Sequence, residues 1–300
     1  MPTVRALLAE TLLAMLAAQS SGYSGTVALV TGANKGIGKE IARGIAADST
    51  ATVLIGCRDE SLGAAAAAEL RASGCLGSLV PLRLDLTDIN SITDAASFVK
   101  REFGTLDCLI NNAAICFNDP TLYGKTKHTP FQAQAAITID TNFFGTLAVT
   151  QALLPLLRSS QSPRIINIAS YAGRLTILKS PEKVAFFTAP DLELSGLTAA
   201  MRQFVVDVEA GTHAAQGWPN TCYGMSKLGL IALTRILARA EPSFMVNAVD
   251  PGYCATDQNQ NQGHMSAAQG ARTPLLLASR SPVEEILSGL LFREGRQVDW

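Results

Sequence analysis

The chain of 300 residues carries few charges and no excess of either sign. Charged residues make up 16% of it, below the usual ~25%, and the formal net charge is −1. This balance argues against a nucleic-acid binder, which needs a strongly basic surface. No apolar run reaches the ~18 residues of a transmembrane helix, so no membrane span is expected. The 48% of hydrophobic residues excludes a disordered, collagen-like or coiled-coil chain.

The sequence also lacks a C-x-x-C pair. Its six cysteines are Cys57, Cys75, Cys108, Cys116, Cys222 and Cys254. Several lie in or beside apolar runs, and a chain of this length does not need disulfides. We therefore expect reduced, buried thiols in a cytoplasmic protein, and no metal site.

The first 25 residues form an N-terminal extension with two open interpretations. Thr3–Gln19 is rich in alanine and leucine, with leucines at positions 8, 12 and 16. A signal peptide needs a basic start, an apolar run and a small-residue cleavage site, but Glu10 interrupts the run here. An amphipathic helix packed on the domain fits better, and a targeting peptide is the alternative.

From residue 26 onward, short apolar runs alternate with longer helical patterns. The predicted strands are Thr26–Thr31, Ala51–Cys57, Ser78–Leu84, Leu106–Asn111, Arg164–Ser170, Phe244–Val249 and Leu290–Arg293. The predicted helices are Gly36–Ala47, Glu60–Ser73, Asp88–Phe103, Pro130–Leu157 and Thr221–Ala240. Such alternation predicts an α/β fold with a doubly wound parallel sheet, because the strands are apolar on both faces. A chain of this length can form one such domain, here 26–300.

One long stretch, 171–220, contains no predicted strand. Asp191–Gly211 within it is predicted to be helical, with an apolar stripe of Leu194, Leu197, Met201, Phe204 and Val208. We expect this stretch to be an insertion over the carboxyl edge of the sheet, at the active site. Its stripe can bury itself on the chain's own helices, which favours a monomer.

A glycine-rich segment, Thr31-Gly-Ala-Asn-Lys-Gly-Ile-Gly38, joins the first strand to the first helix. Its spacing is G-x-x-x-G-x-G, so the strand–turn–helix context carries the prediction of a Rossmann-type dinucleotide site. The first glycine permits a tight turn, the second lets the backbone approach a diphosphate, and the third lets helix and strand pack closely. The helix N-terminus offers free N–H groups to the phosphate. The predicted binding residues are Gly32, Asn34, Lys35, Gly36, Ile37 and Gly38.

The end of the second strand indicates which dinucleotide binds. Cys57 stands where NAD binders usually place an acid for the ribose 2′-hydroxyl, and Arg58 follows it. Arg58 and Lys35 could together pair with a 2′-phosphate, which favours NADP(H). Two solvated surface cations are the alternative, and Asp59 could compete for the hydroxyl.

A Y-x-x-x-K spacing opens the predicted helix at 221–240. It places Tyr223 and Lys227 on one helix face, where the ammonium should lower the tyrosine pKa from about 10. The motif is common by chance and gains weight only beside other motifs.

With those motifs the sequence resembles the short-chain dehydrogenases/reductases, and among them the monomeric NADPH-dependent carbonyl reductases. The resemblance covers roughly Thr26 to Trp300. The matching segments are Thr31–Gly38, Leu84–Leu86, Asn111–Ala114, Thr141–Gly145, Ile166–Ser170, Gly217–Pro219, Tyr223–Lys227, Asp250–Gly252 and Val298–Trp300. Carbonyl reductases carry a similar insertion, which covers the helix face that relatives use to form dimers.

The resemblance implies four catalytic residues: Asn142, Ser170, Tyr223 and Lys227. Ser170 would hydrogen-bond the substrate carbonyl, and Tyr223 would donate the proton. Lys227 would hold the nicotinamide ribose and lower the pKa of Tyr223. Asn142 would position Lys227 and a water in a proton relay.

The resemblance also implies further contacts. Asp85 and Leu86 would line the adenine site, and Asn111 would contact the adenosine side. The predicted contacts at the nicotinamide end are Pro251, Gly252, Cys254 and Thr256. Gln134 and Trp218 would touch substrate.

Three substitutions depart from the pattern of those relatives: Ala114 replaces a glycine, Tyr253 a tryptophan, and Leu62 a second arginine beside Arg58. The implied activity is reduction of ketones, aldehydes or quinones to alcohols by hydride transfer from NADPH. An alcohol dehydrogenase for one terpenoid or steroid metabolite is the alternative enzyme. A non-catalytic dinucleotide-sensing protein is the alternative from another class.

Overall fold

The computed structural model describes residues 25–117, 129–279 and 287–300. Within them, strands form one sheet in the order β3-β2-β1-β4-β5-β6-β7-β8. Their bounds are β1 (Val27–Thr31), β2 (Thr52–Cys57), β3 (Ser78–Arg83), β4 (Cys108–Asn111), β5 (Arg164–Ile168), β6 (Met245–Asp250), β7 (Leu291–Arg293) and β8 (Arg296–Val298). All neighbours pair in parallel except β7 and β8. The strand order reverses between β1 and β4, which confirms the doubly wound prediction and marks the ligand-binding crevice.

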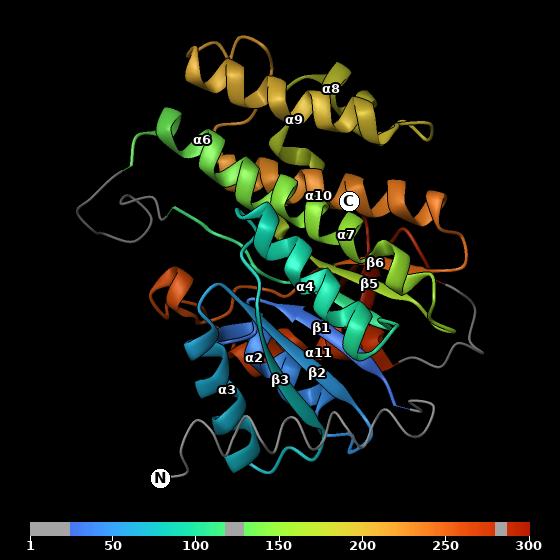
Figure 1. Ribbon diagram of the computed structural model, residues 1–300. Helices are drawn as coiled ribbons and strands as arrows, with labels where there is room; N and C mark the ends of the chain where they lie inside the picture. Colours follow the sequence, from blue (N-terminus) through green and yellow to red (C-terminus); the bar gives the residue numbers. More distant parts are fainter. Residues whose placement is uncertain (1–24, 118–128, 280–286) are drawn as a thin grey trace.

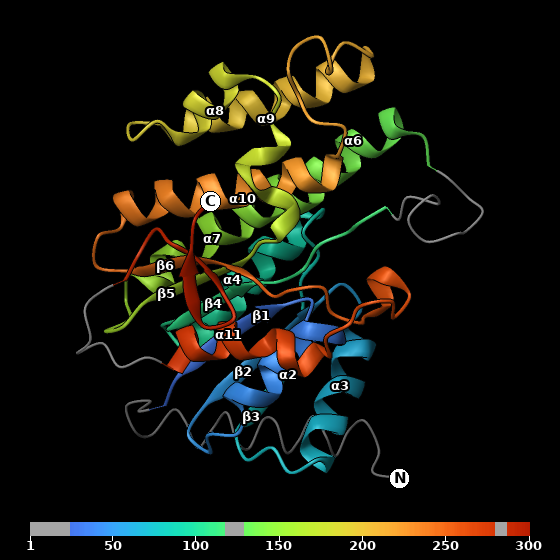
Figure 2. The same ribbon diagram turned by 180° about the vertical axis from the view of Figure 1, so that it is seen from behind.

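Helices cover both faces of this sheet (Figures 1 and 2). One face carries α2 (Gly36–Ile45), α3 (Glu60–Ala72) and α11 (Ala267–Ser279), and the other carries α4 (Ile89–Glu102), α7 (Thr146–Leu157) and α10 (Cys222–Ala240). Along β1, Ala28 and Val30 pack into the first layer, whereas Val27 and Leu29 pack into the second. The continuous apolar strands follow from this double cover.

Three local features differ from the sequence prediction. The helix expected at Pro130–Leu157 is α6 (Phe131–Ile139), a π-helical segment η1 (Asp140–Gly145), and then α7. A Cβ on Gly145 would lie 2.4 Å from the carbonyl oxygen of Leu86, so this wide turn fits closely against the loop after β3. Helix α11 was not predicted, because it contains Pro274, a residue that usually ends a helix.

Strand β8 was not predicted either, because its hairpin lacks an Asn-Gly signal. The turn consists of Glu294 and Gly295, both with positive φ (49° and 74°). Such a pair joins two antiparallel strands tightly, although glutamate is uncommon in that conformation.

The insertion contains α8 (Pro181–Thr188) and α9 (Leu194–Glu209). Four residues of the predicted stripe of α9 are fully inaccessible, namely Leu197, Met201, Phe204 and Val208, and Leu194 is half-buried. The stripe packs on α6 and α10, so α8 and α9 form an outer layer beyond those helices (Figure 1). The apolar stripe of α9 thus pairs with faces of α6 and α10.

The described ranges contain no helix that is both long and apolar enough to cross a membrane. The helix or targeting peptide predicted at Thr3–Gln19 lies outside the described residues.

Candidate active site

Two adjoining cavities lie at the carboxyl edge of the sheet. The larger, about 580 Å³, is lined by the loops that follow β1, β2, β3, β4 and β6, and is called the cleft below. The smaller, about 270 Å³, lies beside Ser170 and Tyr223 and is called the inner pocket. The two share the lining residues Ile37, Asn112, Ala114, Thr256 and Gln258.

The glycine loop forms one wall of the cleft. Gly32 and Gly36 have φ values of +66° and +57°, which side-chain-bearing residues rarely adopt. A Cβ on Gly38 would lie 2.5 Å from the carbonyl oxygen of Gly32, so this glycine permits the close packing that was predicted. Helix α2 starts at Gly36 without a side-chain cap, which leaves N–H groups free for an anion. This cradle fits a dinucleotide diphosphate.

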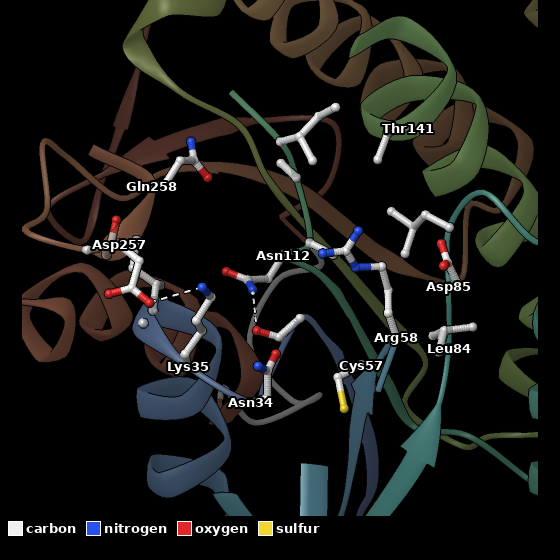
Figure 3. Close-up of a pocket in the computed structure, with 18 of the residues that line it drawn as sticks. Asn34, Lys35, Cys57, Arg58, Leu84, Asp85, Asn112, Thr141, Asp257 and Gln258 are labelled. Carbon is white, nitrogen blue, oxygen red and sulfur yellow. Dashed lines mark hydrogen bonds and ion pairs between the residues drawn. The ribbon is translucent and has the colours of Figure 1, made fainter. Parts of the chain in front are cut away.

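The end of β2 places a cation in the cleft. Arg58 lines the cleft, and no hydrogen bond or ion pair holds it within the described part of the chain. Figure 3 shows its guanidinium directed into the open space. Asp59 instead caps α3 by accepting hydrogen bonds from the Ser61 backbone N–H and hydroxyl (2.9 and 2.6 Å). Its carboxylate is therefore engaged away from the ribose hydroxyl for which it could have competed.

Two of the three residues expected on the adenine side, Asp85 and Leu86, line the cleft. Asn111 does not: it is 3% exposed and its Nδ2 donates to Thr150 Oγ1 and Asn167 Oδ1, beneath the cleft floor. Asn112 lines the cleft in its place. Since side chains alternate along a strand, a shift of one residue moves a side chain from the cleft into the core.

The inner pocket brings the three principal predicted residues together. Ser170, Tyr223 and Lys227 all line it, although they come from the end of β5 and from α10. Lys227 is 2% exposed, and its Nζ donates to the carbonyl oxygen of Ile168 at 2.6 Å. The same Nζ lies 5.6 Å from the centre of the Tyr223 ring.

The proton affinities in this pocket differ from the sequence prediction. Burial raises the pKa of Tyr223, while hydrogen bonding with Gln258 and Ser170 only partly opposes that rise. Burial also lowers the pKa of Lys227, from its ordinary 10.5 to about 8. The net direction at Tyr223 is therefore opposite to the expected lowering, because the loss of water outweighs the hydrogen bonding that would lower its pKa.

The buried Lys227 yields a stability prediction. Its folded-state pKa lies below its unfolded value, so the cost of burying the charge is fully present below about pH 8 and fades toward pH 10.5. We expect Lys227→Met to stabilise the protein by roughly 1–3 kcal/mol at pH 7, since each pKa unit is about 1.4 kcal/mol and one hydrogen bond is lost. Denaturant unfolding at several pH values measures this gain, which should shrink above pH 8. A gain that is constant with pH would contradict it.

Asn142 lies in the π-helical segment and is fully buried. Its Nδ2 donates to the carbonyl oxygen of Ile115 (2.9 Å) and to Ser226 Oγ (3.1 Å), and its Oδ1 accepts from the N–H of Ile115 (2.8 Å). Ser226 in turn donates to the carbonyl oxygen of Tyr223. Asn142 therefore ties the loop after β4 to the first turn of α10. A π turn inside an α-helix is often found at a functional site.

The loop after β6 forms the far wall of the inner pocket. Pro251, Gly252, Cys254 and Thr256 all line it, in agreement with their predicted place near the nicotinamide end. Tyr253, which replaces the relatives' tryptophan, is 40% exposed and lines the same wall.

The structure does not bring Trp218 or Gln134 to the lining of either cavity. Trp218 is 4% exposed, and its Nε1 donates to Asp207 Oδ2 at 2.7 Å within the insertion. Lys183 lies 3.3 Å above its ring centre. Trp218 therefore packs within the insertion, and its predicted contact with substrate stays a prediction. Gln134 donates to the carbonyl oxygen of Thr129 at the start of α6.

Gln258 and Cys116 are among the lining residues that the sequence did not predict. Gln258 lines both cavities and is one of the groups that act to lower the pKa of Tyr223. Cys116 lines the inner pocket, where burial raises the pKa of its thiol to about 11. Both lie in loops without a motif, so only the fold reveals them. Among the residues that the structure describes, no group of three or more metal-ligating side chains is close enough to hold an ion.

Comparison with known proteins places this site in a family. Residues 26–203 match the family model described as short chain dehydrogenase. The chain is a short-chain dehydrogenase. Its relatives confirm the resemblance that the motifs indicated.

Carbonyl reductase (NADPH) 1 from Bos taurus is 37% identical over 92% of this short-chain dehydrogenase and 99% of that protein. Carbonyl reductase (NADPH) 3 from Mus musculus is 38% identical over 91% of this chain and 98% of that protein. Among solved structures, salutaridine reductase from Papaver somniferum aligns with a TM-score of 0.79 and 29% identity over 89% and 99% of the two chains. Menthone neomenthol reductase from Mentha piperita aligns with a TM-score of 0.76 and 30% identity, over 90% of this chain and 99% of that chain.

Proposed function

We propose that this short-chain dehydrogenase reduces carbonyl compounds to alcohols with NADPH. The observation that carries the proposal is the convergence of Ser170, Tyr223 and Lys227 on a pocket that adjoins the cleft. Relatives at 37–38% identity are NADPH carbonyl reductases, which supports the same cofactor and reaction type here.

NADPH, when bound, supplies the hydride for the carbonyl carbon. Different residues of the cleft would bind different parts of NADPH. The N-terminus of α2 at Gly36 would hold the diphosphate, Arg58 the 2′-phosphate, and Asp85 with Leu86 the adenine end. Lys227 would hold the nicotinamide ribose.

The inner pocket supplies the proton. Ser170 would donate a hydrogen bond to the carbonyl oxygen, and Tyr223 would transfer its phenolic proton to that oxygen as negative charge develops there. The raised pKa keeps Tyr223 protonated at neutral pH, as a general acid must be. Lys227 would stabilise the phenolate left behind, and Asn142, through Ser226, holds the turn that carries Tyr223.

The first experiment is an assay of NADPH consumption with a panel of ketones, aldehydes and quinones, repeated with NADH. We expect turnover with NADPH and a lower kcat/KM with NADH. Binding of NADPH without turnover of any carbonyl would instead support the dinucleotide-sensing alternative.

One second candidate has support from a specific likeness. The menthone neomenthol reductase is named for a single cyclic terpenoid ketone and its alcohol, and it is 30% identical over 90% of this chain. The alternative is therefore an oxidoreductase for one such metabolite, running in either direction. Activity confined to one cyclic ketone or its alcohol would favour it over a broad carbonyl reductase.

We also propose that the protein is a monomer in the cytoplasm. The apolar stripe of α9 packs on α6 and α10, so the chain itself covers those faces of the two helices. All six cysteines are free thiols, which suits a reducing compartment. Sedimentation at micromolar concentration should give a mass near 31.6 kDa, and a dimer or tetramer mass would contradict the monomer.

A further inference from the structure

An ion pair joins the two walls of the cleft. Lys35 Nζ lies 2.9 Å from Asp257 Oδ2, and the two side chains are 63% and 65% exposed. Lys35 belongs to the glycine loop, whereas Asp257 follows β6, and both residues line the cleft. Figure 3 shows Lys35 turned toward Asp257 rather than toward Arg58.

The aspartate side of this pair is fixed by its loop. Thr256 and Asn259 bracket Asp257 in a reciprocal capping box, and Asn259 Nδ2 also donates to the carbonyl oxygen of Cys254 at 2.8 Å. Asn259 is 8% exposed, so the loop is anchored in the protein. The lysine, in contrast, has a flexible four-carbon stem. The pair therefore opens by movement of Lys35.

Before any cofactor binds, Arg58 and Lys35 therefore differ in their ion pairing. Arg58 has no partner in the described chain and is ready for an anion, whereas Lys35 must first leave a carboxylate. An exposed ion pair of this kind is weak, and a phosphate dianion is a stronger partner for an ammonium. The carboxylate also repels an approaching phosphate.

We propose that Asp257 is a cofactor-specificity residue that competes with the 2′-phosphate for Lys35 and so weakens the hold on NADPH. The inference rests on the proposed use of NADPH, but not on the proposed carbonyl substrate. Asp257 thereby limits the preference for NADPH over NADH that Lys35 and Arg58 create, and favours release of the oxidised cofactor.

The test uses adenosine 2′,5′-bisphosphate and AMP, which carry no nicotinamide, as probes in calorimetric titrations of the full chain. We expect Asp257→Asn to bind the bisphosphate about two- to fivefold more tightly, the size of an exposed ion pair, and AMP almost unchanged. In fluorescence titrations, Asp257→Asn should likewise bind NADPH about two- to fivefold more tightly and NADH almost unchanged. Because these are binding measurements, they stand even if no carbonyl is reduced.

Two further variants complete the test. In a Lys35→Met background, Asp257→Asn should lose most of its effect, because the freed lysine is absent. Asp191→Asn, which removes an exposed acid on the insertion, should leave both affinities unchanged. An equal gain for the bisphosphate and AMP, no gain, or a loss for the bisphosphate would overturn the proposal. The proposal would also be overturned if Asp257→Asn tightened bisphosphate binding equally in the Lys35→Met background.

Discussion

Replacing Tyr223 by phenylalanine is expected to lower kcat for carbonyl reduction at least 100-fold. The change removes the proposed general acid, a contribution of about 10²–10⁴-fold, together with a hydrogen bond to the developing alkoxide. It leaves the ring in place, so the packing of α10 against its neighbours is preserved. Steady-state kinetics with NADPH and a reactive ketone measure the loss.

Binding of NADPH supplies the control for this variant. The cleft contacts come from Gly36, Lys35 and Arg58, none of which touches the phenol, so the affinity should change little. Lys227→Ala should instead lower both kcat and cofactor affinity, since its ammonium would serve the ribose as well as the phenol. A Tyr223→Phe enzyme that keeps more than about a tenth of its activity would show that another group is the acid.

The pH dependence gives a second check on the same assignment. The acid is Tyr223 with a raised pKa, so the rate of reduction should not fall with rising pH until well above neutrality. Lys227, with a pKa of about 8, loses its charge in the protein alone before the phenol does. Cofactor affinity and kcat should therefore both begin to fall near pH 8, because the Lys227 ammonium would serve the ribose as well as the phenol.

The sequence predicted the sheet well because each strand is a short apolar run bounded by loop residues. The family resemblance singled out Ser170, Tyr223 and Lys227, which line one pocket in the structure. The sequence could not show whether Asn111 or Asn112 lines the cleft, because a shift of one residue along the strand turns a side chain from the cleft into the core. The sequence also did not predict that Asp59 caps α3, because no motif indicates its hydrogen bond with Ser61.

Other features depend on contacts between distant segments. The π turn at Asn142 fits against Leu86, and the insertion packs on α6 and α10 because its stripe finds apolar helix faces there. Trp218 is a large side chain beside a matched motif, yet a buried carboxylate, Asp207, holds it inside the insertion. Gln258 and Asp257 lie in a loop whose course is set by its own capping box.

Reversing the charge at Arg58 should change the cofactor preference. Arg58→Asp is expected to lower kcat/KM with NADPH by roughly 10- to 150-fold, because losing a charge-assisted contact costs about 1.5–3 kcal/mol. Activity with NADH should be kept or improved, since the new acid lies one residue after the position where NAD binders hold the ribose 2′-hydroxyl. Both values come from steady-state kinetics with the same ketone.

Lys35→Met and Arg58→Met are a matched pair of variants that separates the two cations. Arg58 has no partner among the described residues, whereas Lys35 must leave Asp257 before it can meet a phosphate. Lys35→Met should therefore lose less NADPH activity than Arg58→Met, although each removes one positive charge from the cleft. Equal kcat/KM values for NADPH and NADH in the unmodified protein would mean that neither cation contacts a 2′-phosphate. A larger loss from Lys35→Met would instead show that the ion pair opens without cost and that the lysine is the principal phosphate ligand.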